Sequence, residues 1–130
     1  MLVDKKKSIN VERFEKNYSQ FVGMQEEISI LSKKNPDGKM NTFKIKHINQ
    51  LLCQANELLG DKYIPMQGFT VFDEELLPSN SDVVFMLSQY INCMEELKIE
   101  HVVGWDTNWH WKINGLETDI RTSRPKKTVR

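Results

Sequence analysis

The residues best suited to chemistry in this sequence are its histidines, its cysteines and a short acidic cluster. His110 and Asp119 lie on either side of Asn114-Gly115, so a tight turn there would place the imidazole opposite the carboxylate. Such a pair could act as a general base, but no nucleophile lies beside it, and a cross-strand ion pair explains it equally well. We therefore expect no catalytic residues.

The spacing of histidine and cysteine does not fit a metal site. His47 and Cys53 share one helical pattern six positions apart, and this is not a zinc-ligand spacing. Cys93 and His101 are eight positions apart, which fits no better. Both cysteines fall in apolar helical patterns and are expected to be buried as small hydrophobic side chains. The carboxylates of residues 73–75 are typical of a charged first helical turn, so we expect no metal and no cofactor.

Sequence motifs of common enzymes are also missing. The chain contains no phosphate-binding loop, no dinucleotide-binding glycine pattern, no His-Glu-x-x-His and no Gly-x-Ser-x-Gly. We therefore expect a protein that is not an enzyme. The alternative is a small hydrolase or transferase with an unfamiliar site, which would need a concave pocket around His110 or His101.

All three tryptophans of the chain lie close together near its C-terminal end. Asn114-Gly115, between runs that alternate apolar and polar residues, is a strong hairpin signal. A two-residue turn there would place Trp109 and Trp111 on one side of the ribbon. The predicted cross-strand pairs are Ile113 with Leu116, Trp111 with Thr118 and Trp109 with Ile120 on that side, and Lys112 with Glu117, His110 with Asp119 and Asn108 with Arg121 on the other.

Two roles are open to the tryptophans. Trp109 and Trp111 could cover the core, because the apolar helix predicted just before them needs an apolar surface to pack on. Alternatively, one or more indole rings stay exposed for a partner, and Trp105 is the best placed because it lies near a bend. Exposed rings beside basic residues could also stack on single-stranded bases.

Three helices are predicted from apolar residues at helical spacing. The first spans about 11–34, and the second spans about 42–59 and ends at Gly60, a residue that tolerates the left-handed conformation. The third spans about 82–99 and is apolar enough to be the central helix. Its polar strip consists only of Ser88, Gln89, Asn92, Glu95 and Glu96.

The first helix carries an apolar row that could serve either the core or a partner. Phe14, Phe21 and Ile28 recur every seven residues, and Asn17 interrupts the neighbouring row. This stripe either packs on the chain's own core or forms a coiled coil or groove contact with a partner, which could be a second copy of the chain in a homodimer.

The C-terminal part is predicted to be an antiparallel β-meander or hairpin over about 101–122, with residues 100–105 containing its first strand. Residues 69–72 could add a short strand, and residues 73–77 a single helical turn. The fold class is therefore α+β, with three main helices and a C-terminal meander in one domain of residues 1–130. Basic, disordered ends are expected at about 1–8 and 123–130.

Charge is unevenly distributed, although the formal net charge is zero. Residues 8–120 hold ten bases against seventeen acids, whereas residues 121–130 hold five bases and no acid. The basic end could contact an anionic partner, and its segment 123–127 resembles short basic arms that follow DNA grooves. No apolar run is long enough to cross a membrane and no signal-peptide pattern is present, so we expect a cytoplasmic protein without membrane contact.

The function that these features favour is non-enzymatic binding, in which an adaptor, inhibitor or regulatory subunit docks on another macromolecule. The candidate residues for a protein partner or for self-association are Phe14, Phe21, Ile28, Trp105, Trp109 and Trp111. The alternative is a nucleic-acid-binding protein whose hairpin aromatics stack on bases. Its candidate phosphate contacts are Arg121, Arg124, Lys126 and Lys127.

Overall fold

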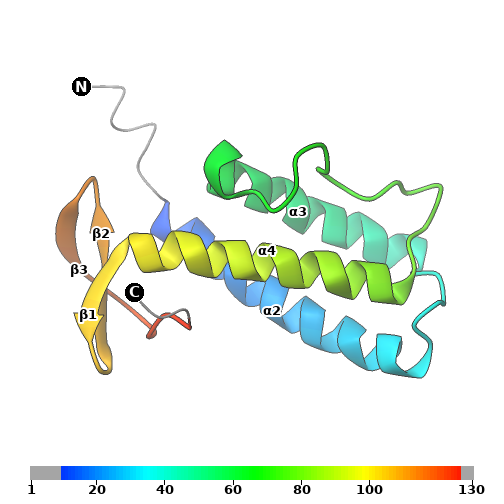
Figure 1. Cartoon of the computed structure of the whole chain (residues 1–130), viewed down its shortest axis with the longest axis horizontal. Coiled ribbons are helices and arrows are strands. Elements are labelled where there is room, and N and C mark those ends of the chain that lie inside the picture. The colour runs from blue at the N-terminus through cyan, green and yellow to red at the C-terminus, as the bar shows by residue number, and fades with distance from the viewer. Residues whose placement is uncertain (1–9, 127–130) are drawn as a thin grey trace.

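The computed structural model describes residues 10–126, which form three long helices followed by three antiparallel strands. The helices lie side by side, and the sheet closes one end of the bundle (Figure 1). This arrangement confirms the predicted α+β fold with three main helices and a C-terminal meander. The elements are α2 (Val11–Lys34), α3 (Thr42–Tyr63), α4 (Asn80–Glu100), β1 (Val102–Trp105), β2 (Asn108–Ile113) and β3 (Leu116–Thr122).

Each helix begins where the sequence supplies an N-cap. The side chains of Asn10, Asn41 and Ser79 accept hydrogen bonds from the backbone N–H three residues further on. The bounds of α2 match the prediction, and α4 extends slightly beyond its predicted ends. The regular part of α3 is interrupted at Gly60, the predicted end, where φ is 66°. One further helical turn follows this kink, and α3 therefore extends to Tyr63.

The central helix is α4, as its apolar sequence predicts. It packs against both α2 and α3, and it has more buried residues than either of them. Leu87 and Tyr90 are fully buried, and the ring of Tyr90 stacks on that of Phe21 from α2 with centroids 5.7 Å apart. The core therefore runs along the length of α4, and the sheet lies where this helix ends (Figure 1).

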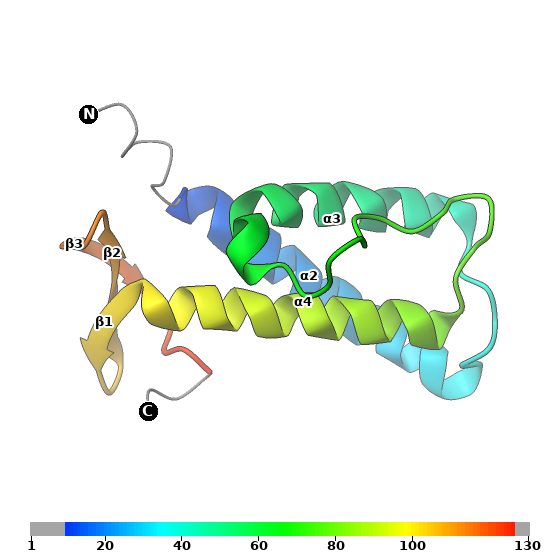
Figure 2. The ribbon, with the colours of Figure 1, turned by 45° about the horizontal axis from the view of Figure 1, so that its top comes forward.

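The connection between α3 and α4 contains neither the strand predicted at 69–72 nor the helical turn predicted at 73–77. Figure 2 shows this segment running along the bundle, away from the sheet, so no strand is near enough to pair with it. Helix side chains satisfy its backbone instead. Asn49 both donates to the carbonyl of Phe72 and accepts from its N–H, each at 2.9 Å. The aromatic residues of this segment pack against the core, where the ring of Phe69 contacts the rings of both Phe72 and Tyr90.

The hairpin turn forms at the predicted residues. Asn114 and Gly115 both have positive φ, 54° and 78°, which is the conformation of a type I′ turn. Next to the turn, Ile113 pairs with Leu116 and Lys112 pairs with Glu117, as predicted.

Beyond these two pairs the predicted register between β2 and β3 is wrong by two residues. His110 pairs with Arg121 instead of Asp119, and Trp109 pairs with Thr122 instead of Ile120. The shift also excludes the predicted pair of Asn108 with Arg121. Its cause is a bulge on β3, where the hydroxyl of Thr118 donates to the carbonyl of Trp111 at 2.8 Å. A shift of two residues keeps each side chain on its predicted face, because the faces of a strand alternate with a period of two.

The burial of Leu87 in the central helix leads to a stability prediction. Leu87→Ala removes a fully buried side chain where α4 meets its neighbours, and we expect it to lower the free energy of unfolding by ~2–5 kcal/mol. Ile30 is exposed on α2, so Ile30→Ala is the control and we expect a change below ~0.5 kcal/mol. Urea unfolding followed by circular dichroism measures both. Equal effects of the two changes would contradict the central place of α4.

Candidate docking face of the sheet

Trp111 attaches the sheet to the helices. Its side chain is fully buried, and its ring meets that of Phe14 edge to face with centroids 5.4 Å apart. Its indole N–H donates to Oε2 of Glu15 at 2.9 Å, so the polar edge of the ring is satisfied inside the protein. The sequence leaves open whether the tryptophans cover the core or stay exposed for a partner, and Trp111 covers the core.

The same oxygen of Glu15 accepts a second hydrogen bond, from the hydroxyl of Thr122 at 2.6 Å. Trp111 belongs to β2 and Thr122 to β3, so one carboxylate from α2 holds two strands of the sheet. Hydrogen bonds to a charged acceptor are stronger than those between neutral groups. Glu15 is a residue that the sequence patterns did not single out, although it directly follows the buried Phe14.

Two charged side chains of α4 are also buried at this junction. Glu95 is 4% exposed and Lys98 is 3% exposed, so the prediction that Glu95 lies on the polar strip of this helix is wrong. Glu95 accepts hydrogen bonds from the hydroxyl of Tyr18 and, at 3.0 Å, from the backbone N–H of Lys126. Lys98 donates to the hydroxyl of Ser123 at 2.8 Å. These partners compensate part of the loss of hydration that burial imposes.

The segment that follows β3 is held by these contacts. Pro125 is buried, and the backbone N–H of Lys126 is bonded to Glu95. The prediction of disorder from residue 123 onward is therefore wrong for residues 123–126. The remaining predicted disorder, at residues 1–8 and 127–130, lies outside the described residues.

Burial changes the acidity of two groups in this junction. Desolvation lowers the pKa of Lys98, and the negative charges of Glu15 and Glu95 oppose that shift. Burial raises the pKa of Tyr18, and the hydrogen bond to the Glu95 carboxylate raises it further. The lysine and the tyrosine therefore respond to the same environment with shifts of opposite direction.

The outer face of the sheet is the surface that this junction leaves uncovered. On β1, Val102 is buried, whereas Val103 and Trp105 point the other way and are exposed. Val103 pairs with His110 on β2, and His110 pairs in turn with Arg121 on β3. An indole, a valine, an imidazole and a guanidinium therefore share one face. We call Val103, Trp105, His110 and Arg121 the outer face.

Trp105 is 85% exposed and lies at the end of β1. The neighbouring Trp109 is only half-buried against the core, and its indole N–H donates to the carbonyl of Asp106 at 2.7 Å. Gly104, which pairs with Trp109, allows the close approach of these two residues, because a Cβ on Gly104 would lie 2.7 Å from Cα of Trp109. The three tryptophans thus lie in three environments, and only Trp105 leaves most of its side chain exposed to solvent.

The other predicted partner residues are placed in the core. Phe14, Phe21 and Ile28 are each at most 1% exposed, so packing within the chain accounts for this heptad row. Asn17, which interrupts the neighbouring row, is buried as well. The row therefore offers no surface to a second copy of the chain in this structure.

The candidate phosphate contacts are divided between two places. Arg121 belongs to the outer face, whereas Arg124 and Lys126 are exposed on the segment that follows β3. Lys127 lies outside the described residues. The structure thus brings one of the four basic residues, Arg121, onto the same face as an exposed tryptophan.

The cysteines and histidines do not assemble into a site. The prediction that Cys53 is buried is wrong. Cys53 is exposed because it lies on the solvent side of α3, whereas its neighbours Leu52 and Ala55 are buried. Cys93 is half-buried against the core, and His47 is exposed as its position on the helix implies. Among residues 10–126, no three His, Cys, Asp or Glu side chains are grouped to hold a metal ion.

The two histidines considered for catalysis have local structural partners. Nδ1 of His101 lies 2.7 Å from the carbonyl of Leu97 at the end of α4, and its ring contacts that of Tyr63. Nε2 of His110 lies 2.8 Å from Oδ1 of Asn108. Two hollows on the helical bundle are lined by α2, by α3 and by the segment after α3, and neither is lined by a histidine.

No protein family, curated protein or solved structure matches this chain. None of the helices between residues 10 and 126 combines the length and the apolar character needed to cross a membrane. The surfaces described above are therefore the basis for inferring a function.

The contact of Glu15 with two strands leads to a second stability prediction. Glu15→Ala leaves the buried indole N–H of Trp111 without an acceptor, and we expect the free energy of unfolding to fall by ~1–3 kcal/mol. Glu26→Ala, an exposed change on the same helix, is the control and should alter it by less than ~0.5 kcal/mol. Urea unfolding gives both values. A double-mutant cycle with Thr122→Val that returned no coupling would contradict the shared contact.

The lowered pKa of Lys98 leads to a prediction of pH dependence. Below its ordinary pKa of 10.5, the unfolded chain holds the Lys98 proton more tightly than the folded chain does. This residue therefore makes stability rise as pH increases toward 10.5. Lys98→Met should reduce this rise in unfolding curves recorded between about pH 8 and pH 9, below the ordinary tyrosine pKa of about 10. The exposed Lys46→Met is the control, and an unchanged slope in Lys98→Met would contradict the prediction.

Proposed function

We propose that this chain is a non-enzymatic binding protein that docks on another protein through the outer face of its sheet. The observation that carries this proposal is the 85% exposure of Trp105 on a strand whose other face is locked onto the helices. Burial of a large exposed aromatic ring by a partner contributes more to the free energy of binding than burial of a small side chain does. Tryptophan is accordingly enriched at the centre of protein interfaces.

The neighbours of Trp105 suggest what the partner surface contains. Val103 adds apolar area beside the ring, and Arg121 brings a positive charge to the same face. A complementary surface would offer an apolar recess for the indole and an acidic group for the guanidinium, because interfaces combine an apolar centre with a polar rim. The junction around Glu15 supports docking, since it fixes the sheet before the partner arrives and so reduces the entropy lost on binding.

Binding of single-stranded nucleic acid is the second candidate. It is favoured by one observation, the common face of Trp105 and Arg121, because ring stacking and phosphate contact are the two elements of such sites. It is less well supported than protein docking, since Trp111 is buried and Trp109 is half-buried, which leaves one indole for stacking. The excess of acids over bases in residues 8–120 would also repel a polyanion.

A photo-cross-linking experiment tests the proposal. Trp105 is replaced by the photo-reactive p-benzoylphenylalanine in cells that naturally make the protein, and the same substitution at Phe43 is the matched control. Phe43 is 82% exposed at the start of α3, at the end of the bundle far from the sheet (Figure 1). We expect position 105 to yield a discrete protein adduct that position 43 does not yield. In direct binding to that partner, Trp105→Ala should weaken affinity by at least about tenfold.

The same experiment separates the other outcomes. An adduct with a second copy of the chain would identify the chain itself as the partner. An adduct that nuclease removes, together with oligonucleotide binding that weakens with salt and with Arg121→Gln, would overturn protein docking in favour of nucleic acid. Equal adducts at positions 105 and 43 would overturn the outer face as a docking site.

A further inference from the structure

The two edges of the sheet differ in how they are protected against pairing with a further strand. The strand order β1-β2-β3 places β1 at one edge and β3 at the other, and among residues 10–126 each of them pairs only with β2. β3 carries a bulge and the charged residues Glu117, Asp119 and Arg121, and both features discourage edge pairing. β1 has a regular register and no charged residue. β1 is therefore the edge that is open to another strand.

The backbone of β1 directs hydrogen-bonding groups to its free side. The N–H of Lys112 donates to the carbonyl of His101 at 2.8 Å, so His101 is a residue whose backbone faces β2. Residues of an antiparallel pair face the neighbouring strand alternately, so Val103 also faces β2 and Gly104 faces away from it. Gly104 consists of backbone alone and is exposed. Its N–H and C=O can therefore pair with a strand that approaches this edge.

We propose that the β1 strands of two copies of the chain pair antiparallel around a two-fold axis at Gly104 and so form a homodimer. The two glycines exchange a pair of N–H···O=C hydrogen bonds across the axis. Val103 of each copy then lies opposite Trp105 of the other, on the outer face of both sheets. Side chains lie closest in such non-hydrogen-bonded pairs, and an aromatic ring beside a β-branched side chain is a favourable combination. The strand is thus complementary to itself.

The charge and the size of the joined sheet agree with this pairing. The formal net charge of the chain is zero, so two copies do not repel each other as a whole. Three strands from each copy give a sheet of a common size, with both outer faces on the same side. Arg121, two strands away from the axis, stays at the rim. The inference deepens the proposed function, because it names a second copy of the chain as the protein that covers Trp105.

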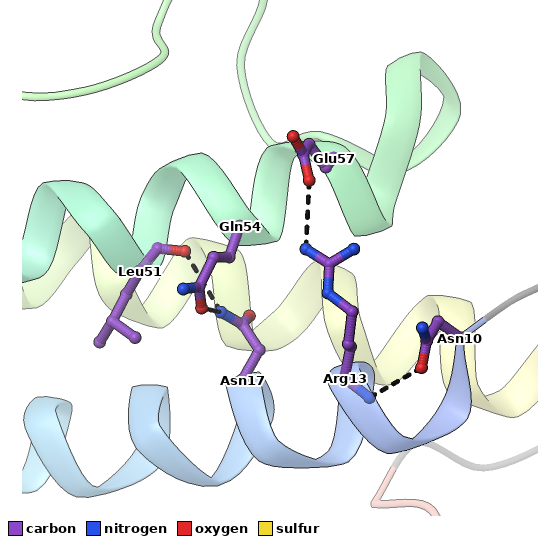
Figure 3. Close-up of polar contacts among 6 residues, drawn as sticks. All are labelled: Asn10, Arg13, Asn17, Leu51, Gln54 and Glu57. Carbon is purple, nitrogen blue, oxygen red and sulfur yellow. Dashed lines mark hydrogen bonds and ion pairs between the residues drawn. The ribbon is translucent and has the colours of Figure 1, made fainter.

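The helices offer a less suitable contact for a second copy where α2 faces α3. The guanidinium of Arg13 pairs with Glu57 at 3.1 Å (Figure 3). The amide nitrogen of Asn17 donates to the carbonyl of Leu51 and to Oε1 of Gln54, each at 3.3 Å. These polar side chains join the two helices within one chain, whereas the edge of β1 has no such partner in its own sheet.

Sedimentation equilibrium of the full chain tests the dimer. A contact of this size belongs to the weak class of interfaces, so concentrations from about 1 µM to 1 mM are needed, and we expect a reversible monomer–dimer equilibrium. Trp105→Ala should weaken the dimer at least about tenfold, and it leaves the core intact because Trp105 is exposed. Leu116→Ala is the matched control, since Leu116 is 72% exposed on the other edge strand, and it should leave the dissociation constant unchanged.

Cysteine substitutions test the register. Chains with Val103→Cys are mixed with chains with Trp105→Cys and mildly oxidised, all in a Cys53→Ser background that removes the exposed native thiol. Opposite residues of a non-hydrogen-bonded pair have Cα atoms about 4.5 Å apart, which a disulfide can bridge. We expect the mixture to give a covalent dimer in much higher yield than either chain alone, because identical positions in the two copies are displaced by two residues along the strand.

Three results would overturn the homodimer. They are a monomer at every concentration, a dimer that Trp105→Ala does not weaken, and equal cross-linking in the mixture and in the single variants. Failure of the proposed function gives a different result. A monomeric chain whose position 105 still forms an adduct with a different protein would overturn self-pairing alone, whereas equal adducts at positions 105 and 43 would overturn docking through the outer face.

Discussion

The carboxylate of Glu15 accepts hydrogen bonds from two strands, and the position of the whole sheet depends on this contact. Without it, the indole N–H of Trp111 would be buried against Phe14 without an acceptor. The buried charges of Glu95 and Lys98 add a second set of contacts that hold the segment after β3. Together they turn a small meander, which would be marginal alone, into a rigid end of the bundle that presents one face to solvent.

Much of the fold could be predicted because the decisive interactions are local. Apolar spacing and an N-cap define α2, and Asn114-Gly115 defines the hairpin turn, so both were predicted at the right residues. The prediction fails where hydrogen bonds between side chains and backbone, which the polarity pattern does not record, accompany the course of the chain. The strand register shifts at the bulge beside the bond from Thr118 to Trp111, and Asn49 takes the hydrogen bonds that a strand at 69–72 would have made with a neighbour. Sequence patterns record polarity along the chain, and these bonds depend on what lies opposite in space.

The same limit applies to the candidate sites. Trp105 and Trp111 are the same residue type in adjacent strands, and only the position of the bundle makes one of them core and the other surface. Glu95 looked like part of a polar strip because its buried partners, Tyr18 and Lys126, come from distant parts of the chain. Asn17 was visible in the sequence as a break in an apolar row. Its hydrogen bonds to Leu51 and Gln54 form only when α2 and α3 come together.

The bonds from Glu15 also have a consequence for how the chain is made. They join residues separated by 96 and 107 positions, so synthesis must proceed through β3 before α2 can meet both strands. During translation, Phe14 therefore lacks its contact with the Trp111 ring at the stage when the helices can already associate. Contacts of such long sequence separation slow folding. Docking of the sheet is thus expected to be a late event, completed after the last strand has left the ribosome.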